Sequence, residues 1–505
     1  MNLRMQRITA YLLRSAAIVM AVLFSVSCTK DEEDPRYPHA SRVVLVYMAG
    51  DNSLGGYAWD NLNAMARGMA SAPAGSRTIA YVDTPGENPR LVEVTASGTK
   101  TLHTWPSPHN SASAATVREA IGRMRTLAPA DRYGLVLWSH GLAWIPSWAT
   151  GYLTRSKARM AEPWPQTKHD GAASETSASF LPAAFFASAP ASVTATGSAP
   201  AMSASCVAFP LVGAAFPHRP VPALRFDTVT GYAAGIPAGM VRAVPACPAI
   251  FPVSSAAVPW PATKWFGQDT GESPAGYLDV EQLSEAIPSG VFDWILFDAC
   301  FMASAETLYA LRDKAERIVC SPAEVIADGF PYAEIMAELL RPEPDLRAVC
   351  ESYYLHYARH AQSSYRSATV SLVETSQLEA LAAATASVLG TALATDPEAL
   401  AGMDLNRLQP LDRYRRHFLF DAGSVVGELE TRGLVPASLA EAWRAQLART
   451  VTYEAHTPTM LGLALDECCG LSMYVPYADY ADLNEYYRTL EWYRQCYPAD
   501  HPMDR

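Results

Sequence analysis

Residues 292–300 read FDWILFDAC, a run of apolar side chains that ends in a small residue and a cysteine. Two similar runs, RVVLVYMAG and YGLVLWSHG, occupy residues 42–50 and 133–141. Their apolar residues are continuous, not alternating, which is typical of strands buried on both faces of a parallel sheet. The sequence therefore predicts a mostly parallel β-sheet that is covered on both sides.

Shorter runs extend this pattern. Four further strands are predicted, at residues 78–83, 317–320, 368–373 and 471–475. Helical patterns lie between the strands, at residues 115–127, 303–312 and 378–389. Strands that alternate with helices form βαβ units. We therefore expect an α/β protein with a sheet of about six strands.

The composition is that of a globular protein. Half of the 505 residues are apolar and 18% are charged, and a chain of this length forms roughly two to four domains. The net charge is -12 and no long basic run is present, which argues against a nucleic-acid-binding protein. Nine cysteines are too few for a disulfide scaffold. No apolar run is long enough for a protein that spans a membrane many times.

Residues 1–28 have the pattern of a secretory signal peptide, with arginines ahead of a short apolar run at residues 16–24. Cys28 resembles the cysteine of bacterial lipoproteins that receives the lipid, although Ser25 stands where a large aliphatic residue is usual. Residues 29–41 form an acidic, proline-containing linker that resembles the surface-export signal of Bacteroidetes lipoproteins. We expect a lipid-anchored outer membrane protein that faces outward; a secreted protein with a plain linker is the alternative.

Residues 150–262 do not continue the strand–helix pattern. Between residues 171 and 262 there are thirteen prolines and five charged residues, and prolines at this density block regular structure. We expect a poorly ordered insertion rich in Ala, Pro and Ser. It divides one domain into two parts, residues 42–149 and 263–375. Residues 376–505 are expected to form a mainly helical C-terminal region with one further strand, a candidate second subdomain.

Polar residues follow the predicted strands at Asp51, Asp83, His140 and Cys300. The carboxyl ends of parallel strands meet at one edge of the sheet, where sites form. A cysteine is a good nucleophile as a thiolate, and a nearby imidazole can accept its proton. The backbone N–H groups of Gly141 and Cys300 would then stabilise an oxyanion. The alternative is that Cys300 and His140 are buried structural residues.

Several segments match a known family in sequence order. They are VVLVYMAGDNSLGGYAWDNLNAM (43–65), YGLVLWSHG (133–141), WFGQD (265–269), FDWILFDACFMASAETLYALRD (292–313), SPAEVIADGFPY (321–332), SLVE (371–374) and GLSMYVP (470–476). On these segments the sequence resembles the clostripain family of cysteine peptidases, which shares the caspase-like fold with caspases, gingipains and legumains. The resemblance implies a three-layer sandwich, with His140 as general base and Cys300 as nucleophile.

The resemblance also implies cleavage after Arg or Lys in protein or peptide substrates. By motif match, Asp298 and Asp328 would bind the basic side chain, and a guanidinium or ammonium group needs such charged partners when it is desolvated. The alternative is that Asp298 caps a loop and Asp328 caps a turn at Gly329. A different preference, as in gingipains or legumains, remains open, and Leu142 departs from the small polar residue usual after the glycine.

Many members of this family are cut between their histidine and cysteine motifs, and the insertion at residues 150–262 contains several basic residues. Self-cleavage there is therefore a hypothesis. No cofactor is expected to be required; calcium is possible at Asp51 and Asn52, where turn capping is the alternative. A noncatalytic surface-binding lipoprotein with an inactive caspase-like domain is the rival to a peptidase.

Two other groups of residues are expected to have structural roles. His356 and His360 are spaced to share one helix face, but no third metal ligand is evident, so no metal site is predicted. Cys468 and Cys469 are adjacent and are expected to be buried thiols at a strand start.

Overall fold

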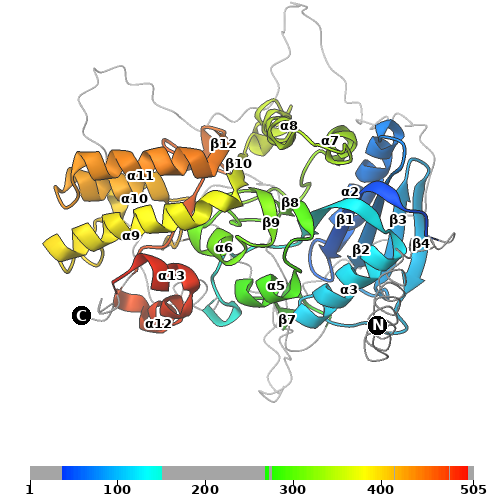
Figure 1. Cartoon of the computed structure of the whole chain (residues 1–505), viewed down its shortest axis with the longest axis horizontal. Helices are drawn as coiled ribbons and strands as arrows, with labels where there is room; N and C mark the ends of the chain where they lie inside the picture. Colours follow the sequence, from blue (N-terminus) through cyan, green and yellow to red (C-terminus); the bar gives the residue numbers. More distant parts are fainter. Residues whose placement is uncertain (1–36, 150–267, 272–275, 415, 477, 499–505) are drawn as a thin grey trace, which may run out of the picture. The chain divides into compact units, whose positions relative to one another are not determined.

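Figure 1 shows the computed structural model of the chain. It describes residues 37–149, 268–271, 276–414, 416–476 and 478–498. The signal peptide, Cys28 and residues 29–36 of the linker lie outside the described residues, and so does the insertion at residues 150–262. The predictions for those segments therefore stay predictions.

A nine-stranded sheet forms the centre of the described part of the chain, in the order β12-β10-β9-β8-β5-β1-β2-β3-β4. Its five central strands, from β9 to β2, are parallel. The outer strands on both sides are antiparallel to their neighbours. The strands are β1 (Ala40–Ala49), β2 (Ser76–Asp83), β3 (Arg90–Thr95), β4 (Gly98–Thr104), β5 (Ala130–Trp138), β8 (Phe292–Asp298), β9 (Ala315–Cys320), β10 (Thr369–Glu374) and β12 (Val451–His456).

The predicted class is confirmed, but the expected number of six strands is too low. The sequence missed β3, β4 and β12, which lie at or near the edges of the sheet. Residues of β4 are half-buried or exposed along its whole length, so they form no continuous apolar run. The strand predicted at residues 471–475 is present but shorter. It is β15 (Ser472–Met473), which pairs with β11 (Phe420–Asp421) in a separate two-stranded sheet.

Helices cover both faces of the sheet and make it the middle of three layers. Successive residues of β1 alternate between two buried clusters: Val43 and Leu45 contribute to one, and Val44 and Val46 to the other. The second cluster is completed by α2 (Gly55–Gly68), α7 (Tyr332–Leu339) and α8 (Leu346–Ala358). The first is completed by α3 (Ala114–Leu127), α5 (Val280–Ala286) and α6 (Ala305–Ala310), on the other side in Figure 1. Strand alternation thus supplies both hydrophobic layers.

The C-terminal helices belong to the same compact unit and do not form a separate subdomain. They are α9 (Leu378–Thr395), α10 (Ala422–Thr431), α11 (Ala437–Thr450), α12 (Ala481–Thr489) and α13 (Glu491–Cys496), and all contribute to the first buried cluster. Helix α9 is long and apolar enough to suit a membrane span. It packs on α11 and α13 instead, and Trp443 of α11 donates a hydrogen bond to Thr385 of α9 at 2.9 Å. Its apolar character is therefore explained by packing inside the protein.

Candidate active site

His140 and Cys300 leave the sheet at the same edge. Strands β5 and β8 are parallel neighbours in which Trp138 lies opposite Asp298. His140 and Cys300 each follow two residues later, so the two loops begin side by side. Both residues are buried, with exposed fractions of 5% for His140 and 0% for Cys300. The expectation that neighbouring strands would carry both residues to one edge is confirmed.

Gly141 packs directly on the backbone of Cys300. A β-carbon at position 141 would lie 2.1 Å from the carbonyl oxygen of Cys300 and 2.9 Å from its nitrogen. No side chain fits such a gap, so glycine is required here for reasons of space. In the structure, the group that approaches it closely is the peptide of Cys300.

The thiol of Cys300 contacts a peptide group of the neighbouring loop. The backbone N–H of Val325 donates to Sγ at 3.0 Å, and Sγ donates to the carbonyl oxygen of Val325 at 3.6 Å. The next residue, Phe301, has a φ of 64°, a left-handed conformation that costs about 1–3 kcal/mol for a residue other than glycine. The N–H of Phe301 donates to the carbonyl of Ala323 at 2.8 Å. The loop that carries Cys300 is thus held against residues 323–325.

The imidazole of His140 has a neighbour that the sequence did not single out. Its Nε2 lies 3.1 Å from the hydroxyl oxygen of Ser53, which is exposed in the loop after β1. Beside it, the hydroxyl of Ser139 donates to the carbonyl of Ala49 at the end of β1, at 2.7 Å. The sequence could have pointed to Ser53 only through its position just after β1, which ends at the same edge of the sheet as β5 and β8.

The structure places Asp298 and Asp328 differently with respect to solvent. Asp298, at the end of β8, is fully buried and accepts hydrogen bonds from the hydroxyl of Tyr332 at 2.8 Å and the N–H of Phe330 at 3.4 Å. Asp328 is exposed, and its carbonyl accepts a hydrogen bond from the side chain of Asn61 at 3.0 Å. Phe330 and Tyr332 follow Asp328 closely in sequence. The segment after Asp328 therefore ties it to the neighbourhood of Asp298.

A pocket lies between the loops that follow His140 and Cys300. Leu142, Ala143 and Met302 line it, and all three come within three residues of His140 or Cys300. The remaining lining residues are Ile145, Tyr277, Leu278, Asp279, Val280 and Leu283. Most of the residues that line the pocket are apolar.

Three carboxylates converge at the ends of β1 and β2. Asp51, Asp83 and Asp269, the last in β6 (Gln268–Asp269), each offer an oxygen within 4.8 Å of the others. Ser111 fixes Asp269 through its N–H at 2.6 Å and its hydroxyl at 3.0 Å. Asp83 is 2% exposed and its Oδ2 has no hydrogen-bond partner. Oxygen ligands in this arrangement fit a hard divalent cation such as calcium.

The electrostatics of this cluster agree with that fit. Burial and the charges of Asp269 and Asp51 raise the pKa of Asp83 to about 8. Burial and the charge of Asp269 raise the pKa of Asp51 to about 6. Carboxylates that repel one another in this way are stabilised by a bound cation. The sequence had pointed to Asp51 and Asn52 as calcium candidates. It did not single out Asp269, because that residue lies far away along the chain.

His356 and His360 do not lie on one helix, and Cys468 and Cys469 do not begin a strand. His356 lies in the last turn of α8, with Nδ1 at 3.7 Å from a carboxylate oxygen of Glu334, whereas His360 follows the end of that helix. Within the described residues, neither histidine belongs to a group of three metal-ligating side chains. Cys468 and Cys469 are free thiols, as expected. They are half-buried and precede β15 by three or more residues, so their predicted place at a strand start is wrong.

The chain matches the profile of the clostripain family over residues 46–158 and 255–431. No curated protein matches it. Among solved structures it resembles an inactive zymogen C11 protease from Parabacteroides distasonis, with 26% identity over 91% of this chain and 99% of that chain, at a TM-score of 0.61. It also resembles a secreted C11 cysteine protease from Bacteroides thetaiotaomicron in complex with an irreversible peptide inhibitor. There the identity is 22% over 90% of this chain and 99% of that chain, at a TM-score of 0.59.

Proposed function

Because this chain belongs to the clostripain family of cysteine peptidases, we propose that it hydrolyses peptide bonds after Arg or Lys, with Cys300 as nucleophile and His140 as general base. The observation that carries the proposal is the contact between their loops. The residue after His140 packs on the peptide of Cys300, with no room for a β-carbon. This contact holds the base and the nucleophile in a fixed relation, as proton transfer between them requires.

The reaction needs only groups of the chain and water. His140 accepts the thiol proton of Cys300, and the thiolate sulfur attacks the carbonyl carbon of the scissile bond. The backbone N–H groups of Gly141 and Cys300 stabilise the oxyanion, a contribution worth about 3–4 kcal/mol per donor in other enzymes. The amine leaves with the proton held by His140. Water, deprotonated by the same imidazole, then attacks the thioester and releases the acid and the thiol.

The described arrangement corresponds to a closed state in this proposal. The sulfur of Cys300 is fully buried and contacts the peptide of Val325, so it must turn away from that peptide before it meets a substrate carbonyl. We propose that self-cleavage within residues 150–262 accompanies this change. A similar solved structure is that of an inactive zymogen, which supports the idea of a closed form.

Asp298 and Asp328 are proposed to bind the basic side chain of the substrate. Asp298 is positioned by Tyr332 and Phe330, and the exposed Asp328 lies at the start of the same segment. A guanidinium between two carboxylates would form charge-assisted hydrogen bonds, the strongest kind available to it. The resulting partners are protein or peptide substrates with Arg or Lys before the cleaved bond.

We propose that the three carboxylates at the ends of β1 and β2 bind calcium. Asp51, Asp83 and Asp269 would hold it, and the ion would offset the burial and the mutual repulsion that together raise the pKa of Asp83 to about 8. It would act on the stability of the strand ends and take no part in the hydrolysis. We further propose that Cys28 carries a lipid and that the protein faces outward from an outer membrane; a secreted form is the alternative.

The test is hydrolysis of two fluorogenic peptides, one with Arg and one with Asp before the cleaved bond. The wild type is expected to cleave the Arg peptide, and Cys300→Ala to cleave neither. Cys469→Ala serves as the matched control, because it also removes a thiol but lies on another segment. Turnover of the Asp peptide would instead favour a different specificity. No turnover by the wild type, even after limited trypsin treatment, would favour the noncatalytic surface-binding protein.

A further inference from the structure

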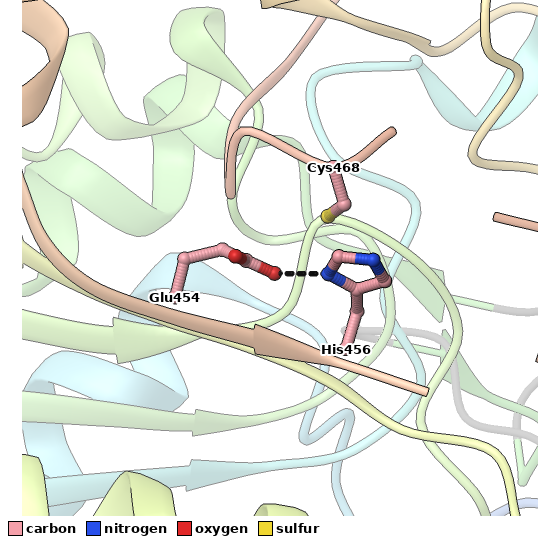
Figure 2. A group of neighbouring side chains, drawn as sticks. All are labelled: Glu454, His456 and Cys468. Atoms are coloured by element: carbon pink, nitrogen blue, oxygen red, sulfur yellow. Dashed lines mark hydrogen bonds and ion pairs between the residues drawn. The ribbon is translucent and has the colours of Figure 1, made fainter. Parts of the chain in front are cut away.

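Glu454, His456 and Cys468 converge at the edge of the sheet, as Figure 2 shows. Glu454 and His456 are two residues apart on the edge strand β12, so their side chains point to the same face of the sheet. Cys468 comes from the segment that precedes β15. One ligand atom of each residue lies within 4.8 Å of the other two. The carboxylate of Glu454 accepts a hydrogen bond from Nδ1 of His456 at 2.6 Å.

Backbone contacts of the two residues that follow Cys468 hold it over this face. The N–H of Cys469 donates to a carboxylate oxygen of Asp421 at 2.6 Å, and the hydroxyl of Ser371 donates to the carbonyl of Gly470 at 2.6 Å. Gly470 has a φ of 82°, and a β-carbon there would meet Ser371 Oγ at 2.8 Å and Glu454 Cγ at 2.9 Å. The segment is therefore pressed onto β10 and β12 by contacts that do not involve the thiol.

We propose that Glu454, His456 and Cys468 bind a zinc ion. Carboxylate oxygen, imidazole nitrogen and thiolate sulfur are the ligands that zinc takes in proteins, and three of them leave a fourth tetrahedral position for water. Binding would replace the hydrogen bond between His456 and Glu454 with two bonds to the metal and would release the thiol proton of Cys468 to solvent. The preformed position of Cys468 lowers the cost of bringing the three ligands together.

This site is separate from the proposed catalytic one. Strand β12 lies three strands away from β8, which leads to Cys300. The two are nevertheless connected through the chain, because the segment after Cys468 continues to Ser472, whose N–H donates to the carbonyl of Ala303 at 2.9 Å. Zinc at β12 would therefore fasten a segment that contacts the loop of the nucleophile. The expected consequence is a higher melting temperature of the whole protein.

The experiment is a titration of the full chain with Co²⁺, which replaces zinc and reports a bound thiolate through a sulfur-to-cobalt charge-transfer absorption in the near ultraviolet. All proteins carry Cys300→Ala, so that the catalytic cysteine cannot contribute. The parent is expected to show the absorption. Cys468→Ser is expected to lose it, whereas Cys469→Ser, the adjacent-cysteine control, should keep it. His456→Gln and Glu454→Gln are expected to bind Co²⁺ at least tenfold more weakly, in line with the loss of a ligand.

Zinc is expected to raise the melting temperature of the parent and of Cys469→Ser, but not that of Cys468→Ser. Absence of the charge-transfer absorption in the parent would overturn the proposal, as would an equal absorption in Cys468→Ser. His456 is partly exposed, so His456→Gln is suited to a folded control even if Cys468→Ser fails to fold. Unchanged Co²⁺ affinity in His456→Gln would overturn the proposal independently.

Discussion

Replacing Gly141 by alanine tests the contact on which the proposed mechanism rests. The added β-carbon would lie 2.1 Å from the carbonyl oxygen of Cys300, whereas ordinary contact begins at 3.4 Å. The two loops would therefore have to separate by about 1.3 Å, the difference between these distances. A displacement of this size at a reacting group costs roughly 100-fold in rate, or about 2.7 kcal/mol of transition-state stabilisation.

The assay is kcat/KM on the Arg peptide, with thermal unfolding measured in parallel. Gly122→Ala is the matched control, because Gly122 is exposed on α3 and a β-carbon there meets no atom within 4 Å. Its kcat/KM should be unchanged and its stability raised by up to about 1 kcal/mol, since alanine favours helix. A Gly141→Ala protein with the kcat/KM of the wild type would refute the reasoning, because it would mean that the loop contact does not position the nucleophile.

Three further predictions concern charged residues. Burial raises the pKa of Glu306 from 4.5 to about 7, so its contribution to stability is complete below pH 4.5 and is lost as the pH rises through about 7. The free energy of unfolding should fall by about 3 kcal/mol over this range. In Glu306→Gln, chemical denaturation should no longer show this pH dependence. An unchanged pH dependence in the variant would mean that Glu306 is not its source. Calcium at about 100 times its Kd should stabilise the wild type by about 2.7 kcal/mol and Asp83→Asn much less. The measurement is thermal unfolding with calcium or with a chelator. Equal shifts of the melting temperature in the two proteins would exclude Asp51, Asp83 and Asp269 as the calcium site. Asp328→Asn should lower kcat/KM on the Arg peptide about tenfold or more, because it removes a charged hydrogen bond worth about 1.5–3 kcal/mol. Asp131→Asn is the control and should leave kcat/KM unchanged, because Asp131 lies at the end of β5 away from His140. Equal kcat/KM values in the two variants would mean that Asp328 does not bind the substrate.

The central strands could be predicted from the sequence because burial on both faces leaves a continuous apolar run. The outer strands could not, since a half-exposed strand such as β4 mixes polar and apolar residues without a clear pattern. Strand β12 reads VTYEAH, an alternation of apolar and polar residues that favours a half-buried strand, but the run is short and follows helix α11 without a break. Its partner β10 is supplied by a segment far away in sequence, and only the folded chain brings them together.

The candidate site, too, could be predicted from the sequence only in part. His140 and Cys300 follow directly from the ends of apolar runs, so local sequence was enough to find them. The contact of Gly141 with Cys300, the neighbourhood of Ser53 and the acidic partner Asp269 depend on how loops distant in sequence pack against one another. No local pattern encodes such contacts, because they arise from the order of strands in the sheet.

The adjacency of β5 and β8 has a consequence for any molecule cut between them. These strands lie on opposite sides of residues 150–262 in sequence, yet they are hydrogen-bonded neighbours in the interior of the sheet. The two pieces of a cut chain would therefore stay associated, because backbone hydrogen bonds between β5 and β8 join them inside the sheet. Each piece made alone would expose an apolar, unpaired central strand and would tend to aggregate. Complementation should accordingly succeed when the two pieces are coexpressed and fail when they are purified separately and then mixed.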